Sequence, residues 1–359
     1  MLKRLAYRAA RTVLPPRYLW PFAFFGAAPL HEARWRWLTL RAPVVSAEEH
    51  AARVGVADRE EVIGCDLCGE RRVQPLFHPA RKKWSYHVVR CPTCGFLYRN
   101  PGIQPARLGE LYSGAGYGRF LTGKYSNKRQ RRYRLVMDGF EPLFADGGGR
   151  RLLDFGCGAG LFLDLAHERG FDCHGVDLSP SAIERARQKP SGAKTYVGSP
   201  LDVPEIAAGG FDVIALWSVM AHLAEPVEDL RMLRGLLAPD GMLLVLTINA
   251  NSLLLKAQGE QWGGFTPNHL KFFSPATLTR ALHLAGFPAV LVEPMYTDPI
   301  EAGSLRLRPR QERRLRRAID HGNRGNMQRA IAFASARSGL GGERAGEPER
   351  PAQLRLVRG

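Results

Sequence analysis

The chain has 359 residues, of which 45% are hydrophobic and 9% aromatic, a composition ordinary for a globular protein with one full α/β domain and smaller attachments. Its 51 Lys and Arg residues outnumber 34 Asp and Glu residues, and the net charge of +17 favours a polyanionic neighbour such as nucleic acid, anionic lipid or a phosphorylated glycan. No apolar run approaches the roughly 20 residues that span a bilayer, which argues against an integral membrane protein.

Residues 1–60 form a basic N-terminal extension that begins with the pattern of an amphipathic helix. Apolar residues follow one face and basic residues the other, and the aromatic run Tyr18–Phe25 comes next. An interfacial membrane anchor has this pattern, and so has a helix packed on the protein's own surface; both interpretations stay open. Because Arg8 and Arg11 interrupt any apolar export signal, we expect a cytoplasmic protein, in peripheral contact with the anionic inner membrane surface if the anchor interpretation holds.

A zinc ribbon is predicted over residues 61–105, because this segment contains two CxxCG motifs separated by a spacer close to that of known zinc ribbons. The four cysteines of these motifs are Cys65, Cys68, Cys91 and Cys94. Four thiolates fill the tetrahedral shell of Zn²⁺ and leave no open position, so the ion would be structural. A pair of unrelated redox motifs is the alternative, and the doubled spacing disfavours it.

Residues 106–146 are predicted as a helical connector or lid, and Gly147-Gly148-Gly149 marks the start of the main domain over residues 147–359. In that domain short apolar segments alternate with helical stretches, the rhythm of a parallel sheet. Strands are predicted at 151–155, 172–176, 193–197, 211–217, 241–248 and 288–293, and helices near 159–169, 180–188, 226–237 and 275–285.

The segment from Leu152 to Gly160 carries the strongest functional signal. An apolar strand ends in Asp154 and opens at once into a turn with glycines at alternate positions, Gly156, Gly158 and Gly160. Glycine permits a sharp turn and close approach of a ligand to the backbone. A second strand ends in Asp177 about 20 residues on, where a ribose-binding carboxylate belongs. The turn is G-x-G-x-G with an acid in front, which differs from the glycine spacing that a pyrophosphate site favours.

With these motifs placed, the chain resembles bacterial class I S-adenosylmethionine (SAM) methyltransferases that carry an N-terminal zinc ribbon, many of them associated with sugars or glycans. The resemblance implies an α/β fold, a Rossmann-like sheet of about seven strands with helices on both faces. It also implies an inserted last strand, which we place near 352–357, and a basic helical insertion at about 300–348. The cofactor-binding residues that it implies are Asp154, Gly156, Gly158, Gly160, Asp177, Leu178, Leu201, Asp202 and Trp217.

His222 and His269 are the candidate catalytic residues. Methyl transfer to a hydroxyl or a carbon acid needs a base, and His222 follows the fourth strand, where active-site groups collect. His269 is the candidate substrate contact. Related sequences usually have an acid immediately before the first histidine, whereas this chain has Ala221, so an acid that would orient His222 is missing. A purely structural role for either histidine stays open.

The expected function is methyl transfer from SAM to a small-molecule or glycan acceptor, at a sugar hydroxyl or carbon, with a nucleotide- or lipid-linked acceptor meeting the basic attachments. The alternative is an RNA methyltransferase that binds RNA through the zinc ribbon and the basic flanks. The chain lacks the base-amine motif and the RNA-binding modules that this alternative favours. A third interpretation is an assembly component without activity, which the two intact acids Asp154 and Asp177 disfavour.

Overall fold

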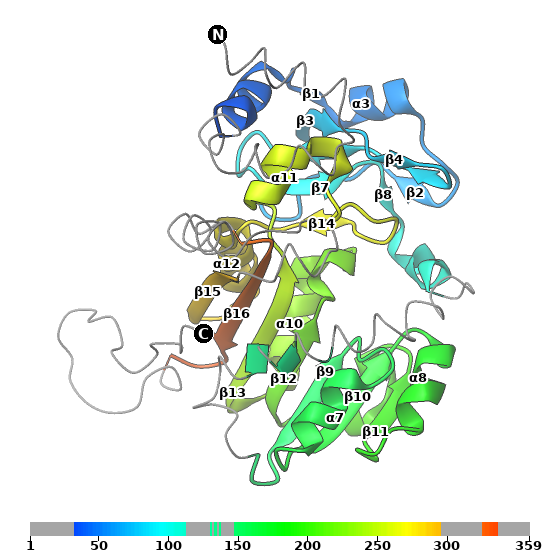
Figure 1. The fold of residues 1–359 in the computed structure, drawn as a ribbon, viewed down its shortest axis with the longest axis vertical. Helices are drawn as coiled ribbons and strands as arrows, with labels where there is room; N and C mark the ends of the chain where they lie inside the picture. Colours follow the sequence, from blue (N-terminus) through cyan, green and yellow to red (C-terminus); the bar gives the residue numbers. More distant parts are fainter. Residues whose placement is uncertain are drawn as a thin grey trace, which may run out of the picture.

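The computed structural model describes residues 32–112, 130, 133–134, 136–137, 147–295 and 325–336. Within these residues the chain forms a large mixed sheet at one end of the molecule and a smaller antiparallel sheet at the other (Figure 1). None of the described helices is long and apolar enough to cross a membrane.

The large sheet has seven strands in the order β11-β10-β9-β12-β13-β16-β15. The first five are parallel, and β16 runs antiparallel to both of its neighbours. The strands are β9 (Arg151–Phe155), β10 (Asp172–Asp177), β11 (Lys194–Val197), β12 (Phe211–Trp217), β13 (Leu237–Ile248), β15 (Ala289–Met295) and β16 (Met327–Phe333). This is the α/β sheet that the sequence predicts.

Helices cover both faces of this sheet, because its central strands carry apolar side chains on both sides. On β9, Leu152 packs with the core under α7, whereas Leu153 packs with the core under α10 and α12. The helices are α7 (Leu161–His167), α8 (Pro180–Arg187), α9 (Pro204–Ala207), α10 (Pro226–Leu236), α11 (Leu253–Gln258) and α12 (Pro275–Leu284), with 3₁₀ turns η2 (Pro200–Asp202), η3 (Met220–His222) and η4 (Gly259–Gln261). Local signals set several starts, such as the capping box of Ser274 and Thr277 before α12.

The small sheet joins segments that are far apart in the sequence. Its order is β1-β3-β6-β7-β14, and all of its pairings are antiparallel. The strands are β1 (Val45–Ser46), β3 (Arg72–Phe77), β6 (Val88–Arg90), β7 (Leu97–Arg99) and β14 (Lys271–Phe272); α3 (Ala47–Val54), the 3₁₀ helix η1 (Pro105–Leu111) and the pairs β2 (Glu60–Glu61) with β8 (Gly102–Ile103) and β4 (Ala80–Arg81) with β5 (Trp84–Ser85) lie around it. Figure 1 shows β14, in yellow, beside β7, in cyan. The predicted ribbon over 61–105 is therefore completed by residues 45–54 and 271–272, outside its predicted bounds.

The strand inserted between β13 and β15 is β16, and this corrects the prediction that placed it near 352–357. Every residue of β16 is buried, including Gln328 and Arg329. Its flanks are basic, so the segment was included in a helical insertion at about 300–348, whereas Met327–Phe333 is extended. Its two faces pack into the cores on opposite sides of the sheet, Ala330 and Ala332 into one and Ile331 and Phe333 into the other, which hides the alternation that identifies a strand from sequence. Residues 352–357 lie outside the described residues, as do residues 1–30 with the predicted amphipathic helix.

Candidate active site and cysteine cluster

The glycine turn lies at the carboxyl end of β9 and leads into α7, as the sequence predicts. Gly156, Gly158 and Gly160 all have positive φ, at 72°, 54° and 73°. The Asp177 carboxylate, at the end of β10, accepts hydrogen bonds from the amide of Gly158 at 2.9 Å and from the amide of Ser179 at 2.8 Å. The two strand ends are thus tied together through one carboxylate.

The loop that follows β12 packs so closely on Gly156 that it leaves no room for a side chain there. A Cβ atom at this position would lie 2.7 Å from Cγ2 of Val219, closer than packed carbon atoms approach. The loop itself is strained, since Ser218 has φ 64° and is the only non-glycine residue with positive φ in the described part of the chain. Strain of this kind concentrates at functional sites, which supports a role for this loop.

Gly156→Ala is expected to lower the free energy of unfolding by about 2–4 kcal/mol, from the left-handed backbone and the contact with Val219. Gly148→Ala is the matched control, because Gly148 also has positive φ, at 52°, but no atom lies within 4 Å of its added Cβ. Urea denaturation measures both. Equal losses in the two variants would contradict a role for the Val219 contact.

Two buried polar atoms beside the turn lack a hydrogen-bond partner among the described residues. They are Oδ1 of Asp154 and Nε1 of Trp217. Asp154 is 2% exposed, and burial, with the charge of Asp177 as a second cause, raises the pKa of its carboxyl well above the ordinary value. Buried polar atoms are almost always paired, so such orphans indicate a missing partner. A bound cation would pair with Asp154 and favour its charged form.

Exposed apolar side chains lie at the next strand ends. Leu178, directly after β10, is 44% exposed, and Leu201, in η2 after β11, is 58% exposed. Asp202 is exposed beside it. Trp217, at the end of β12, is buried instead, with its ring 4.6 Å from that of Phe162 and 5.3 Å from that of Tyr133. Leu178 and Leu201 thus leave an apolar edge where the sequence predicts the adenine, whereas Trp217 is part of the core under α7.

The two candidate histidines come together although 47 positions separate them in the chain (269 − 222). Their rings meet edge to face with centroids 4.7 Å apart. His222 ends the turn η3 after β12, and His269 precedes β14. The amide of Leu270 donates to the carbonyl of Ala221 at 2.7 Å, which holds the two segments side by side.

Tyr112 is a site residue that the sequence did not single out. Its hydroxyl lies 3.0 Å from Nδ1 of His222. A phenol therefore lies against the imidazole of His222. The sequence gives no feature that distinguishes Tyr112 from the other tyrosines in and around the connector.

His269 is held as the neutral tautomer with its proton on Nδ1. Nδ1 lies 2.6 Å from the carbonyl oxygen of Gly264, and a carbonyl can only accept, so Nδ1 donates and Nε2 carries the lone pair. Burial lowers the pKa of His269 to about 4. Its Nε2 is therefore a hydrogen-bond acceptor at neutral pH.

Stability is expected to fall on acidification, partly through His269. The ordinary imidazole pKa is 6.5, so between pH 6.5 and about 4 the unfolded chain binds more protons than the folded chain. This contribution is complete above about pH 6.5 and is lost as the pH falls toward 4. His269→Gln should reduce the loss of unfolding free energy between pH 7 and 5 by about 1–2 kcal/mol, allowing for part exposure of the ring. Urea titrations of both proteins at the two pH values measure it, and an identical loss would contradict the lowered pKa.

The four cysteines predicted as metal ligands form one cluster, and their sulfur atoms all lie within 4.8 Å of one another. All four cysteines are free thiols. The sulfur of Cys65 lies 3.5 Å from that of Cys94, and the sulfur of Cys68 lies 3.5 Å from that of Cys91. Glycines with positive φ follow both motifs, at Gly69 and Gly95. A set of four thiols from two such turns fits a tetrahedral zinc ion.

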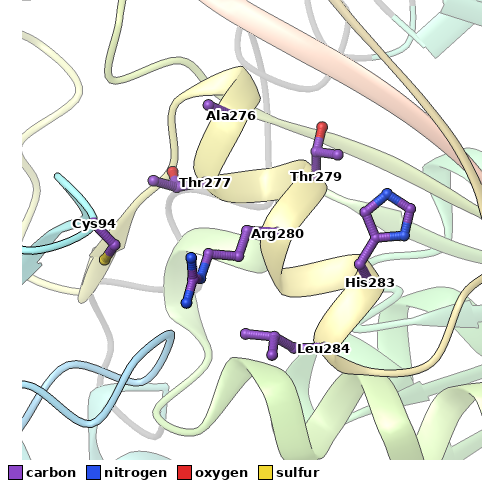
Figure 2. Close-up of a pocket in the computed structure, with 7 residues that line it drawn as sticks. All are labelled: Cys94, Ala276, Thr277, Thr279, Arg280, His283 and Leu284. Carbon is purple, nitrogen blue, oxygen red and sulfur yellow. The ribbon is translucent and has the colours of Figure 1, made fainter.

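Two cavities lie near the cysteine cluster. One, of about 540 Å³, is an open depression between Cys94 and α12 that includes Arg280 and His283 (Figure 2). It is remote from the glycine turn. The other, of about 430 Å³, is lined by segments in and around the small sheet, including Cys65 and Arg99, and by Ala224 and Leu270. The lining of the second cavity includes Leu270, which directly follows His269, so this cavity lies beside the segment that carries His269.

Comparisons with known proteins show a similarity to methyltransferases. Residues 127–292 match the family described as "Methyltransferase domain". The chain is 32% identical over 162 residues to a ubiquinone biosynthesis O-methyltransferase of Cereibacter sphaeroides, a match over 42% of this chain and 66% of that protein. It is 37% identical over 114 residues to the protein of the same name from a Caulobacter species, over 29% of this chain and 45% of that protein. The chain therefore covers less than two thirds of the length of either relative.

Solved structures resemble the chain more weakly. A SAM dependent methyltransferase from Archaeoglobus fulgidus is 22% identical and gives a TM-score of 0.41, with 57% of this chain and 92% of that chain covered. The strand order of the large sheet and the glycine turn agree with the family match of residues 127–292, and the fold is that of class I methyltransferases.

Proposed function

We propose that the protein transfers a methyl group from SAM to a hydroxyl group of a small-molecule acceptor. The observation that carries the proposal is the buried Oδ1 of Asp154, which has no hydrogen-bond partner among the described residues and lies beside three glycines with positive φ. The family match supports methyl transfer, and the names of the relatives support oxygen as the accepting atom.

The residues around the turn fit SAM. Asp154 would pair with the methionine ammonium group, and the glycine turn leaves room for the ligand against the backbone. Each oxygen of Asp177 already accepts one amide and has capacity for a ribose hydroxyl. Leu178 and Leu201 offer apolar surface to the adenine, with Asp202 at its edge. When bound, SAM supplies an electrophilic methyl group.

The two histidines then bind the acceptor and take its proton. His222 takes the hydroxyl proton at Nε2 as the oxygen attacks, which requires that Nδ1–H donates to the Tyr112 oxygen. His269, neutral and with its lone pair on Nε2, accepts a hydrogen bond from the acceptor and orients it. Bound SAM would supply its methyl group to the acceptor oxygen, with the carbon–sulfur bond as the bond broken and S-adenosylhomocysteine as the leaving group. Alignment of the acceptor and exclusion of water supply most of the acceleration in such a displacement.

We extend the proposal to the acceptor class that the sequence favours. A sugar hydroxyl, free or in a nucleotide- or lipid-linked glycan, suits a chain of net charge +17, because the linking phosphates are anionic. An acceptor held at an anionic membrane surface would use the same charge. RNA is the second candidate, and only the charge and the cysteine cluster favour it.

Asp177→Ala tests the cofactor site and is expected to weaken SAM binding about 10- to 100-fold, since hydrogen bonds to a charged group are lost. The matched control is Asp172→Ala, which removes a partly exposed carboxylate at the other end of the same strand. Calorimetric titration with SAM measures both variants. Wild-type affinity for SAM in Asp177→Ala would contradict the proposed ribose contact. If neither the wild type nor the variants bind SAM, the proposed cofactor is wrong and the protein has a role that does not use SAM.

The acceptor is tested with isotopically labelled SAM. The purified protein is incubated with a small-molecule extract, with nucleotide-sugars and with bulk RNA, and the products are analysed by mass spectrometry. We expect label on the oxygen of a small molecule. Turnover on RNA alone would overturn the proposed acceptor class, and SAM binding without any labelled product would overturn the proposed activity.

A further inference from the structure

The cysteine cluster and the histidine pair are connected through β14. Leu270 lies between His269 and this strand, and both of its backbone groups are used. Its carbonyl accepts from the amide of Arg99 in β7 at 2.8 Å, and its amide donates to Ala221 beside His222 at 2.7 Å. One residue therefore fastens the small sheet to the loop that carries His222.

A buried ion pair fixes the same strand to the first cysteine motif. Lys271 is 2% exposed, and its ammonium lies 2.6 Å from Oδ2 of Asp66. Asp66 stands between Cys65 and Cys68, so its position follows the conformation of that motif. The ammonium also lies 5.8 Å from the centre of the Tyr98 ring, across the β7–β14 pairing.

The first motif makes a second contact with the chain that follows β14. Arg280, in α12, donates from Nε to the carbonyl oxygen of Leu67 at 3.1 Å. Figure 2 shows Arg280 and Cys94 lining the same depression. Asp66 thus contacts Lys271 before residues 272–274, and Leu67 contacts Arg280 after them. These contacts fix the chain next to His269.

We infer that Asp66 and Lys271 are positioning residues, through which the cysteine cluster sets His269 against His222. The inference rests on the proposed function, in which these two histidines meet the acceptor. The four sulfurs lie within 4.8 Å of one another, and a metal ion bound to them would hold them in one arrangement and so set the place of Asp66. The ribbon is then part of the acceptor site, and not an appendage that only stabilises the fold.

Lys271→Met tests the inference, because it keeps the length of the side chain and removes its charge. An unpaired Asp66 can disturb folding, so the double variant Asp66→Asn/Lys271→Met, without either charge, is measured in parallel. Lys271→Arg restores a cation. The matched control is Lys194→Met, which removes a lysine from an exposed ion pair at the far edge of the large sheet.

The readouts are zinc per chain, the dissociation constant for SAM, kcat and KM for the acceptor, and NMR titration of the imidazole nitrogens, with His269 assigned from His269→Gln. In both variants without the lysine we expect bound zinc and SAM affinity within about twofold of the wild type. The His269 and His222 signals should shift, the pKa of His269 should move up from about 4, and kcat should fall about 10- to 100-fold. Lys271→Arg should recover most of kcat.

Unchanged histidine signals in a folded double variant that retains zinc would overturn the inference, as would wild-type kcat in both variants. Chelation of the metal from the wild type should move the same two signals, and an unchanged spectrum would remove the metal from the inference. The NMR readout needs no turnover. If no acceptor is methylated but the histidine signals shift, the proposed function fails while the positioning role stands.

Discussion

Cys91→Ser is expected to release the bound metal and to lower the free energy of unfolding by on the order of 5 kcal/mol. Structural zinc contributes about 10–16 kcal/mol to small zinc-finger peptides at neutral pH. The loss is smaller here because the two cysteine motifs also pack on a core that includes Leu67, Val89 and Phe96. A serine hydroxyl cannot replace a thiolate in the cluster, and three remaining thiols bind zinc less tightly.

Zinc per chain and urea denaturation measure the effect of Cys91→Ser. Cys173→Ala is the matched control, since Cys173 is a buried thiol in β10 outside the cluster, hydrogen-bonded to the carbonyl of Phe171. It should cost about 1 kcal/mol and keep the full content of zinc. Full zinc content and wild-type stability in Cys91→Ser would contradict a structural metal site.

His222→Gln is expected to lower kcat about 100- to 10,000-fold while the affinity for SAM stays within about twofold of the wild type. General-base catalysis contributes an acceleration of this size. Glutamine keeps the approximate volume and polarity of the side chain but cannot take the proton of an acceptor hydroxyl. The edge-to-face contact with His269 and the contact with Tyr112 involve the imidazole ring, so both change in the variant.

Single-turnover measurements with labelled SAM separate this chemical step from binding and product release. The matched control is His167→Gln, an exposed histidine at the end of α7, which should leave kcat unchanged. If His222→Gln methylates as fast as the wild type, His222 is not the base. A loss of SAM affinity equal to the loss of kcat would assign it to the cofactor site instead.

Patterns that are local in the sequence predicted most of the large sheet. The strands at 151–155 and 211–217 are observed with the same bounds, and that at 172–176 agrees to within one residue. The glycine turn and the paired CxxCG motifs were equally accessible, because each is a short backbone conformation that only certain residues permit. The approach of His222 to His269 was not accessible, since it depends on the pairing of β14 with β7.

The position of the inserted strand marks the limit of local patterns. Residues 327–333 and the predicted segment near 352–357 both follow basic stretches, and either can form a strand. The choice was made by burial between β13 and β15, where Ala330, Ile331 and Ala332 leave almost no surface exposed. Strand propensity depends on such packing more than on the strand's own residues.

By itself, the sequence determined the alternating strands and helices, the acid–glycine turn and the four clustered thiols, because these follow from side-chain periodicity and from backbone conformations that few residues adopt. Only the tertiary structure decided that Met327–Phe333 closes the sheet, that the Tyr112 hydroxyl lies beside His222, and that Asp66 reaches Lys271. These contacts join residues far apart in the chain, and their free energy comes from burial and pairing that exist only after the two sheets have come together.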